Sequence, residues 1–174
     1  MKKMIIDFVE KYNIQVPRYT SYPTVPYWEN NLTESLWSNQ IKKSFLNYNN
    51  EGISLYIHLP FCESLCTYCA CNTRITVNHK VEEPYINAVL NEWQLYRNLF
   101  NAPPLIKEIH LGGGTPTFFS PINKKRLISE ILKDCIIAQN HDFSFEGHPS
   151  NTTVEHLQTL FNLGFKRVSF GIQD

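Results

Sequence analysis

The sequence predicts an α/β fold, the first four strands of a partial TIM-like (β/α) barrel, with an irregular and helical amino-terminal arm. From residue 51 onward, four short β-rich runs alternate with three amphipathic helical segments. The residues with unusual chemistry follow the carboxyl ends of those runs, where parallel barrels carry their sites. We therefore expect an arm and helix over 1–50 and a truncated barrel over 51–174.

The amino-terminal arm differs in composition from the rest of the chain. The segment 17–28, PRYTSYPTVPYW, contains three prolines and three tyrosines, and its prolines favour an irregular, extended backbone. A helix over 32–49 is expected next, because apolar residues recur on one of its faces. These residues are Leu36, Trp37, Ile41, Phe45 and Tyr48.

The first half of the barrel follows in order. A strand is expected over 53–59 and a helix over 84–100, with Pro84 at its first position. A strand over 107–111 comes next. Ser120 and Pro121 then open a helix whose apolar face extends to Ile136.

The second half repeats the pattern. A strand over 143–147 precedes a helix with a capping box formed by Thr152 and Glu155 and a stop at Gly164. The last strand is expected over 166–172. Right-handed crossovers bring the carboxyl ends of all four strands to one edge of the sheet. Four strands do not close a barrel, so the last one should present an unpaired edge.

Charge and hydropathy exclude several functions. Sixteen basic residues balance sixteen acidic ones, so neither nucleic acid nor an anionic membrane is an expected partner. No apolar run approaches the roughly 18 residues of a membrane span, and Asp7 and Glu10 interrupt the first one. We expect a cytoplasmic protein, in which clustered cysteines indicate a metal or catalysis rather than disulfides.

The stretch after the first strand is rich in thiols. A structural zinc site requires a second pair of ligands, and His79 and His110 are isolated. A redox pair is an alternative that would use two of the cysteines. Three thiolates on a tight loop suit a [4Fe–4S] cluster with one open iron. The four cysteines are Cys62, Cys66, Cys69 and Cys71.

Three further features lie on or after the other strands. The sequence GGGTPT over 112–117 permits close approach of a ligand to the backbone, or simply forms a tight turn. Glu146 lies in an otherwise apolar strand and needs a partner, either a ligand or a lysine or arginine. Tyr56, on the first strand, is a candidate for the site or for the core.

The spacing Cys62-x3-Cys66-x2-Cys69, with Tyr68 before the last cysteine, resembles the radical S-adenosylmethionine (SAM) superfamily. The resemblance implies a partial TIM barrel in which these three cysteines ligate a [4Fe–4S] cluster and SAM chelates the open iron. It also implies that Gln173 lies near a second SAM. The residues implied to contact cofactors are Tyr56, Tyr68, Gly113, Gly114, Thr115, Glu146 and Gln173.

A closer resemblance, over 17–174, is to the amino-terminal part of the oxygen-independent coproporphyrinogen III oxidase (coproporphyrinogen dehydrogenase) family. It rests on RYTSYPT, on Cys71 after the three-cysteine motif, on GGGTPT, on Glu146-x-x-Pro149 and on the terminal GIQD. His148 departs from the pattern, because many members have an acidic residue there.

The resemblance implies oxidative decarboxylation of two propionates of coproporphyrinogen III, which gives protoporphyrinogen IX in anaerobic haem biosynthesis. It implies catalytic roles for Tyr56 and for Cys71, a thiol beside the substrate or the second SAM. Arg18 and Arg74 are candidate anchors for the carboxylates of this porphyrinogen substrate. A monomer that receives electrons from flavodoxin or ferredoxin is expected.

Other functions remain open at this point. A haem chaperone or a haem-degrading methyltransferase would use the same cluster, although RYTSYPT and Cys71 argue against both. A zinc-stabilised binding module without catalysis is a third alternative. The chain is also a candidate for an inactive fragment.

Overall fold

The computed structural model describes residues 10–13, 24–67 and 69–171. The chain divides into two compact units, Met1–Leu36 and Trp37–Asp174. In the first unit, a short 3-10 helix, η1 (Val25–Tyr27), closes with a hydrogen bond from the Tyr27 amide to the Thr24 carbonyl oxygen (2.8 Å). The division falls inside helix α2 (Glu34–Tyr48), and the barrel boundary at residue 50 stays a prediction.

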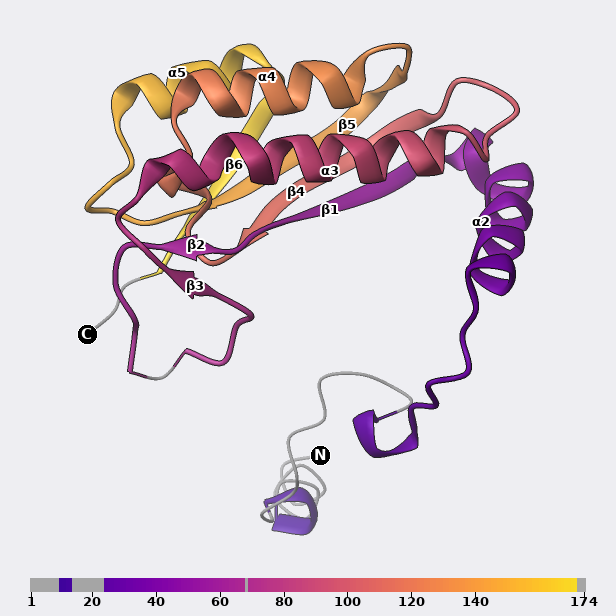
Figure 1. Ribbon diagram of the computed structural model, residues 1–174, viewed down its shortest axis with the longest axis horizontal. Helices are drawn as coiled ribbons and strands as arrows, with labels where there is room; N and C mark the ends of the chain where they lie inside the picture. The colour runs from indigo at the N-terminus through magenta and orange to yellow at the C-terminus, as the bar shows by residue number, and fades with distance from the viewer. Residues whose placement is uncertain (1–9, 14–23, 68, 172–174) are drawn as a thin grey trace, which may run out of the picture. The chain divides into compact units, whose positions relative to one another are not determined.

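A four-stranded parallel sheet forms the centre of the second unit (Figure 1). Its strands lie side by side in chain order, because a helix-containing crossover joins each of the three consecutive pairs. The predicted fold class, an α/β protein with the first strands of a partial barrel, is confirmed. The strands are β1 (Ile53–Leu59), β4 (Leu105–Gly113), β5 (Ile136–Gly147) and β6 (Phe165–Phe170).

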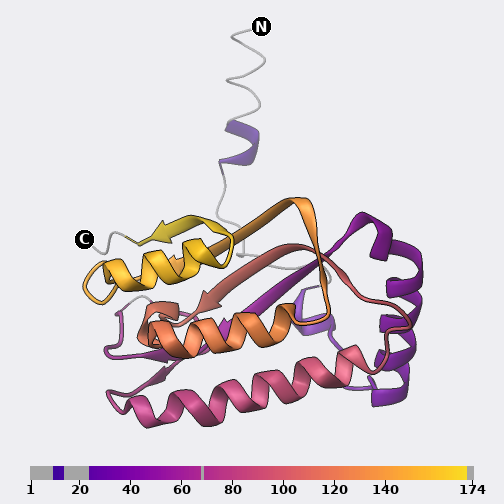
Figure 2. The ribbon, with the colours of Figure 1, turned by 90° about the horizontal axis from the view of Figure 1, so that it is seen from above.

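Three helices cover one face of this sheet, as Figures 1 and 2 show. They are α3 (Glu82–Arg97), α4 (Pro121–Leu132) and α5 (Val154–Asn162). The core lies between the sheet and these helices and contains fully buried aliphatic side chains from both layers. Leu59 and Ile109 from the strands meet Ile86 and Leu127 from the helices in this cluster.

The opposite face of the sheet is polar. Side chains alternate along a strand, so the residues between the buried ones share this face. Tyr56, His110 and Ser144 occupy one row of directly paired positions across β1, β4 and β5. In the described part of the second unit, no helix covers this face (Figure 1), so the row is open to a ligand.

Several predicted helix boundaries were wrong, including the end of α3, which is Arg97 rather than residue 100. Helix α3 begins at Glu82, so Pro84 is its third residue, a position that tolerates proline because first-turn amides have no partner within the helix. Helix α4 ends at Leu132, and Ile136 is the first residue of β5 rather than part of the helix. Asp134 adopts a positive φ of 58° in the intervening turn, which separates the two elements.

The capping box of α5 also lies one residue later than predicted. The Thr153 hydroxyl accepts a hydrogen bond from the His156 amide (3.3 Å), and the His156 ring accepts one from the Thr153 amide (3.1 Å). Thr152 instead donates to the His148 carbonyl oxygen (2.8 Å). The predicted stop at Gly164 is confirmed, with φ +94°.

A small second sheet was not expected from the sequence. Strands β2 (Phe61–Cys62) and β3 (Arg74–Ile75) pair in parallel and close the base of the cysteine loop. In the described ranges, no helix has the length and apolar character required to cross a membrane.

Candidate active site

The cysteine loop, residues 62–71, projects from the carboxyl end of the sheet (Figure 1). Its base is held by two hydrogen bonds, from the Arg74 amide to the Pro60 carbonyl oxygen and from the Thr76 amide to the Cys62 carbonyl oxygen, both 2.8 Å. These bonds place Cys62 at the end of β2, in the small sheet, rather than in the loop beyond it.

The four thiols of this loop are free, with no disulfide among them. Cys62 and Cys66 are half-buried, whereas Cys69 and Cys71 are exposed, and the Cys69 amide donates to the Cys66 carbonyl oxygen (3.0 Å). Among the described residues, no three cysteine, histidine or acidic side chains are drawn together as a metal site. The prediction that Cys62, Cys66 and Cys69 are metal ligands therefore stays a prediction.

The first thiol is in contact with the glycine-rich segment. The Thr115 hydroxyl donates a hydrogen bond to the Cys62 sulfur (3.3 Å). Burial raises the pKa of the Cys62 thiol, the bond from Thr115 opposes this, and the nearby Cys69 and Cys66 raise it further. Iron–sulfur clusters are held by thiolates, and hydrogen bonds to their sulfur atoms are usual. The Thr115 hydroxyl and the nearby Cys66 and Cys69 thiols suit such a cluster at Cys62.

The glycine-rich segment packs so closely that its glycines are required. A Cβ at Gly114 would lie 2.6 Å from the Pro60 carbonyl oxygen and 2.9 Å from the Cys62 sulfur. Gly113 has φ +115°, a conformation that side chains disfavour, and its Cβ would meet the His58 ring at 2.8 Å. The segment thus offers backbone groups without side chains directly beside the cysteine loop.

A row of polar rings follows on the open face. The Tyr56 ring stacks on His110, with centroids 5.9 Å apart and an interplanar angle of 18°. His110 donates to Glu146 (Nε2 to Oε1, 3.4 Å) and its Nδ1 pairs with the Ser144 hydroxyl (2.8 Å). Burial, and then the charges of Glu146 and Cys71, raise the pKa of Tyr56.

The sequence analysis did not identify His58 and His110, the two histidines beside Tyr56, as site residues. His58 donates to the Asn72 carbonyl oxygen (Nε2 to O, 2.7 Å), and its Nδ1 lies 3.1 Å from the Tyr56 hydroxyl. His110 is the partner of Glu146, in place of the lysine or arginine considered as an alternative. Their positions could have identified both histidines. His58 lies two residues after Tyr56 on the same strand, so the two side chains share one face of the sheet. His110 pairs directly with Tyr56 across β1 and β4.

Other candidates lie elsewhere or outside the described residues. Arg74 is exposed on β3 at the base of the cysteine loop. The charge of Cys71 contributes to the raised pKa of Tyr56, which places this thiol in the same electrostatic environment. Arg18, Tyr68 and Gln173 fall outside the ranges that the structure describes.

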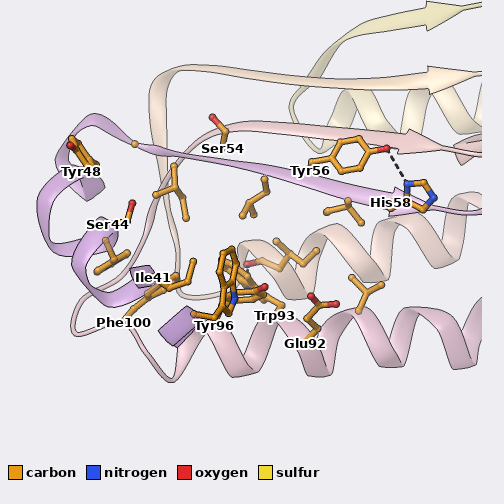
Figure 3. A pocket seen from close by; sticks show the side chains of 18 of the residues that line it. Ile41, Ser44, Tyr48, Ser54, Tyr56, His58, Glu92, Trp93, Tyr96 and Phe100 are labelled. Atoms are coloured by element: carbon orange, nitrogen blue, oxygen red, sulfur yellow. Dashed lines mark hydrogen bonds between the residues drawn. The ribbon is translucent and has the colours of Figure 1, made fainter. Parts of the chain in front are cut away.

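A separate pocket of about 650 Å³ adjoins the site. It lies among α2, β1 and α3, with Tyr56 and His58 toward one end and aromatic side chains such as Trp93 and Phe100 toward the other (Figure 3). None of the cysteines lines it. We therefore assign the candidate chemistry to the carboxyl edge of the sheet and not to this apolar pocket.

The fold and the site together define an α/β protein with a free thiol loop and a glycine-rich segment at one edge of a parallel sheet. The profile of the Radical SAM superfamily matches residues 56–174, and the chain belongs to this superfamily. Membership implies a [4Fe–4S] cluster and SAM. The free thiols of the cysteine loop fit the cluster, and the glycine-rich backbone at the same edge of the sheet fits SAM.

Relatives with defined names match nearly the whole chain. Oxygen-independent coproporphyrinogen III oxidase from Helicobacter pylori is 39% identical over 178 residues, and its namesake from Synechocystis is 34% identical over 168 residues. Each match covers 97% of this chain, but only 38% and 36% of the relative. The chain thus spans little more than a third of the length of these relatives.

A solved structure shows the same arrangement of elements. The structure of coproporphyrinogen III oxidase HemN from Escherichia coli, described as a radical SAM enzyme, superposes with a TM-score of 0.81 at 30% identity. The match covers 96% of this chain and 36% of that one. The resemblance to the radical SAM superfamily drawn from the cysteine spacing is therefore confirmed.

Proposed function

We propose that the chain provides the cluster-binding and SAM-binding part of an oxygen-independent coproporphyrinogen III oxidase. The observation that carries the proposal is the packing of the cysteine loop against the glycine-rich segment, with the Thr115 hydroxyl on the Cys62 sulfur and Gly114 in close contact. Relatives that bear this enzyme's name are 31–39% identical to the chain over nearly the whole length of the chain.

In the proposed reaction, each of two propionates of coproporphyrinogen III loses a hydrogen atom, carbon dioxide and one electron. Each then becomes a vinyl group, and the product is protoporphyrinogen IX of haem biosynthesis. The bound cluster and SAM would supply the radical that takes up the hydrogen atom, and a separate one-electron acceptor would take up the electron. An electron donor such as flavodoxin or ferredoxin serves the cluster, and the protein acts as a cytoplasmic monomer.

The chain's own residues hold and orient the reactants. We assign Cys62, Cys66 and Cys69 to the three irons and leave one iron open for SAM. Backbone groups of the glycine-rich segment orient the methionine part of SAM, since no side chain intervenes. Glu146 lies on the same edge, held by His110, and is assigned to SAM as well. The glycine-rich residues concerned are Gly113, Gly114 and Thr115.

Tyr56 and Cys71 face the reacting part of the site. Tyr56 packs against the glycine-rich segment, since a Cβ at Gly112 would meet its ring at 2.9 Å, and the charge of Glu146 helps to raise the pKa of Tyr56. Cys71 is assigned to the substrate or to a second SAM, with Gln173, while Tyr68 contributes to cofactor binding. Arg74, and Arg18 in the arm, are assigned to the substrate carboxylates.

Electron paramagnetic resonance tests the proposal. The chain is reconstituted anaerobically with iron and sulfide, reduced, and recorded with and without SAM. We expect a [4Fe–4S]⁺ signal that changes when SAM is added, because SAM chelates an open iron. Absence of a cluster, with zinc retained instead, contradicts the proposal and favours a zinc-binding module.

Serine variants identify the ligands. Cys62→Ser, Cys66→Ser and Cys69→Ser should each abolish the signal, because each removes a thiolate ligand. Cys71→Ser should retain it, and Cys135→Ser is the control for a half-buried thiol far from the loop. Loss of the signal in Cys71→Ser, or its persistence in Cys62→Ser, would overturn the ligand assignment.

A further inference from the structure

A buried carboxylate lies outside the row of residues described above. Glu82, in the first turn of α3, is 2% exposed, yet three donors surround it. Its oxygens accept hydrogen bonds from the Ser120 amide (2.9 Å), the Asn123 side-chain amide (2.7 Å) and His79 Nδ1 (2.7 Å). Burial alone would raise the pKa of Glu82, but these bonds outweigh it and hold the pKa below its usual value.

The first two bonds fix the segment that follows the glycines. Ser120 is the cap of α4, and residues 115–120 connect it to the glycine-rich backbone. Two other buried side chains hold the same segment by its carbonyl oxygens. Lys124 Nζ of α4 donates to Pro116 (3.4 Å), and His156 Nε2 of α5 donates to Phe119 (3.1 Å).

The third bond extends from Glu82 toward the cysteine loop. The His79 ring stacks on Phe118, with centroids 4.3 Å apart and planes 13° apart. Its other nitrogen, Nε2, lies 3.7 Å from Glu63 Oε1, and Glu63 directly follows Cys62 in the sequence. Lys124 and His156 hold one loop only, whereas Glu82 with His79 contacts both.

We propose that Glu82 is a positioning residue that fixes the cysteine loop relative to the glycine-rich loop, with His79 as the intermediate. The inference rests on the proposed function, in which one loop holds the cluster and the other holds SAM. SAM must then reach its iron from a separate loop, so an error of about 0.5 Å between the loops weakens chelation. Charge-assisted bonds from Ser120, Asn123 and His79 hold the buried carboxylate of Glu82. His79 continues the connection to the cysteine loop through its ion pair with Glu63 at 3.7 Å.

Hydrogen exchange of the chain without cofactors tests the linkage directly. Glu82→Gln keeps the shape and removes the charge, so amides of 115–120 should exchange about tenfold faster as their buried anchor weakens. Glu83→Gln is the matched control, because Glu83 is the exposed neighbour in the same helical turn. Equal exchange in the two variants would overturn the proposal.

A second variant keeps the test decisive if Glu82→Gln does not fold. His79→Phe preserves the stack on Phe118 and removes the polar contacts with both carboxylates. We expect exchange in residues 62–67 to accelerate more than exchange in the strands of the central sheet, because the contact of His79 with Glu63 connects this loop to Glu82. Unchanged exchange there would show that His79 does not connect the two loops.

The SAM dependence of the reconstituted cluster tests the consequence for the site. Glu82→Gln should retain iron and the reduced-cluster signal but require about tenfold more SAM to change it, while Glu83→Gln behaves like the parent chain. The same SAM requirement in both variants would contradict the positioning role. If the parent chain forms no cluster, the proposed function fails, and the exchange measurements still decide whether Glu82 links the loops.

Discussion

Gly114 shows how strongly one residue constrains the site. Its missing side chain leaves the space in which the Pro60 carbonyl oxygen and the Cys62 sulfur approach the backbone. The backbone cannot retreat easily, because the Gly114 amide donates to the Leu59 carbonyl oxygen (2.9 Å) and the next amide, of Thr115, donates to Phe61 (3.0 Å). The glycine is therefore needed for the approach of two loops and not for an unusual φ.

The substitution Gly114→Ala should consequently separate these loops. We expect the free energy of unfolding to fall by about 1–3 kcal/mol, the usual cost of forcing a methyl group into a packed position. The cluster content after reconstitution should fall as well. Urea titration and iron analysis measure both, with Asn140→Ala on the exposed part of β5 as the control. A Gly114→Ala chain with the stability of the parent would contradict the packing argument.

Site residues that belong to a sequence motif were easier to predict than those whose role depends only on where the fold places them. The cysteine spacing and the run of glycines identify a family without any knowledge of contacts. His58 and His110 belong to no motif, and their role depends on strand pairing that places Tyr56 opposite His110. Pairing between strands separated by a helix cannot be predicted from either strand alone.

At the scale of the helices, α4 carries an unusual side chain on its buried face. Lys124 is fully buried among core residues of the same helix, including Leu127 and Ile128. Its ammonium has the Pro116 carbonyl oxygen within hydrogen-bond distance and the Glu82 charge nearby. Burial lowers the pKa of Lys124 to about 7, and Glu82 only partly opposes this.

This lysine makes stability depend on pH. Its folded-state pKa of about 7 lies below the unfolded value of about 10.4, so the unfolded chain binds more protons between these values. The stability associated with neutral Lys124 is present above pH 10.4 and is lost progressively as the pH falls to 7. Lys124→Met should remove this dependence and stabilise the chain at pH 7.

Urea unfolding at several pH values between 7 and 10 measures the effect as a difference between variants. Lys125→Met is the control, because Lys125 is the exposed neighbour on the same helix. A parallel pH dependence for the parent and Lys124→Met would show that the buried ammonium does not titrate as described.

Helix boundaries that a local cap residue sets were predictable. Ser120 caps α4 as expected, since its hydroxyl accepts from the Asn123 amide (3.3 Å) in a purely local motif. The end of α4 was placed four residues too late, because Ile136 continues the apolar period of the helix in the sequence. In the structure this residue pairs with Leu105 of β4, and that pairing is a tertiary contact.

At the scale of the whole molecule, the sheet has two outer strands. Within the described residues, β6 pairs with β5 alone and β1 with β4 alone. Val168 and Phe170 on β6 are 40% and 42% exposed. An apolar outer strand with unpaired backbone groups favours association with another chain.

The substitution Val168→Lys should therefore reduce the aggregation that appears when the proposed monomer is concentrated, because a charge on an outer strand opposes pairing with a second one. Sedimentation velocity across a range of protein concentrations measures the change. Val154→Lys, at an exposed position in the first turn of α5, is the control for added charge. Identical association of the two variants would exclude β6 as the contact surface.

By itself, the sequence determined the order of strands and helices, the parallel sheet and the superfamily. Apolar periodicity, cap residues and cysteine spacing are local, so each can be read within a few positions. Only the tertiary structure decided that His110 meets Glu146, 36 residues away, and that Glu82 meets Ser120, 38 residues away. Such contacts depend on the register between strands and on the packing of helices against the sheet, which no local pattern specifies.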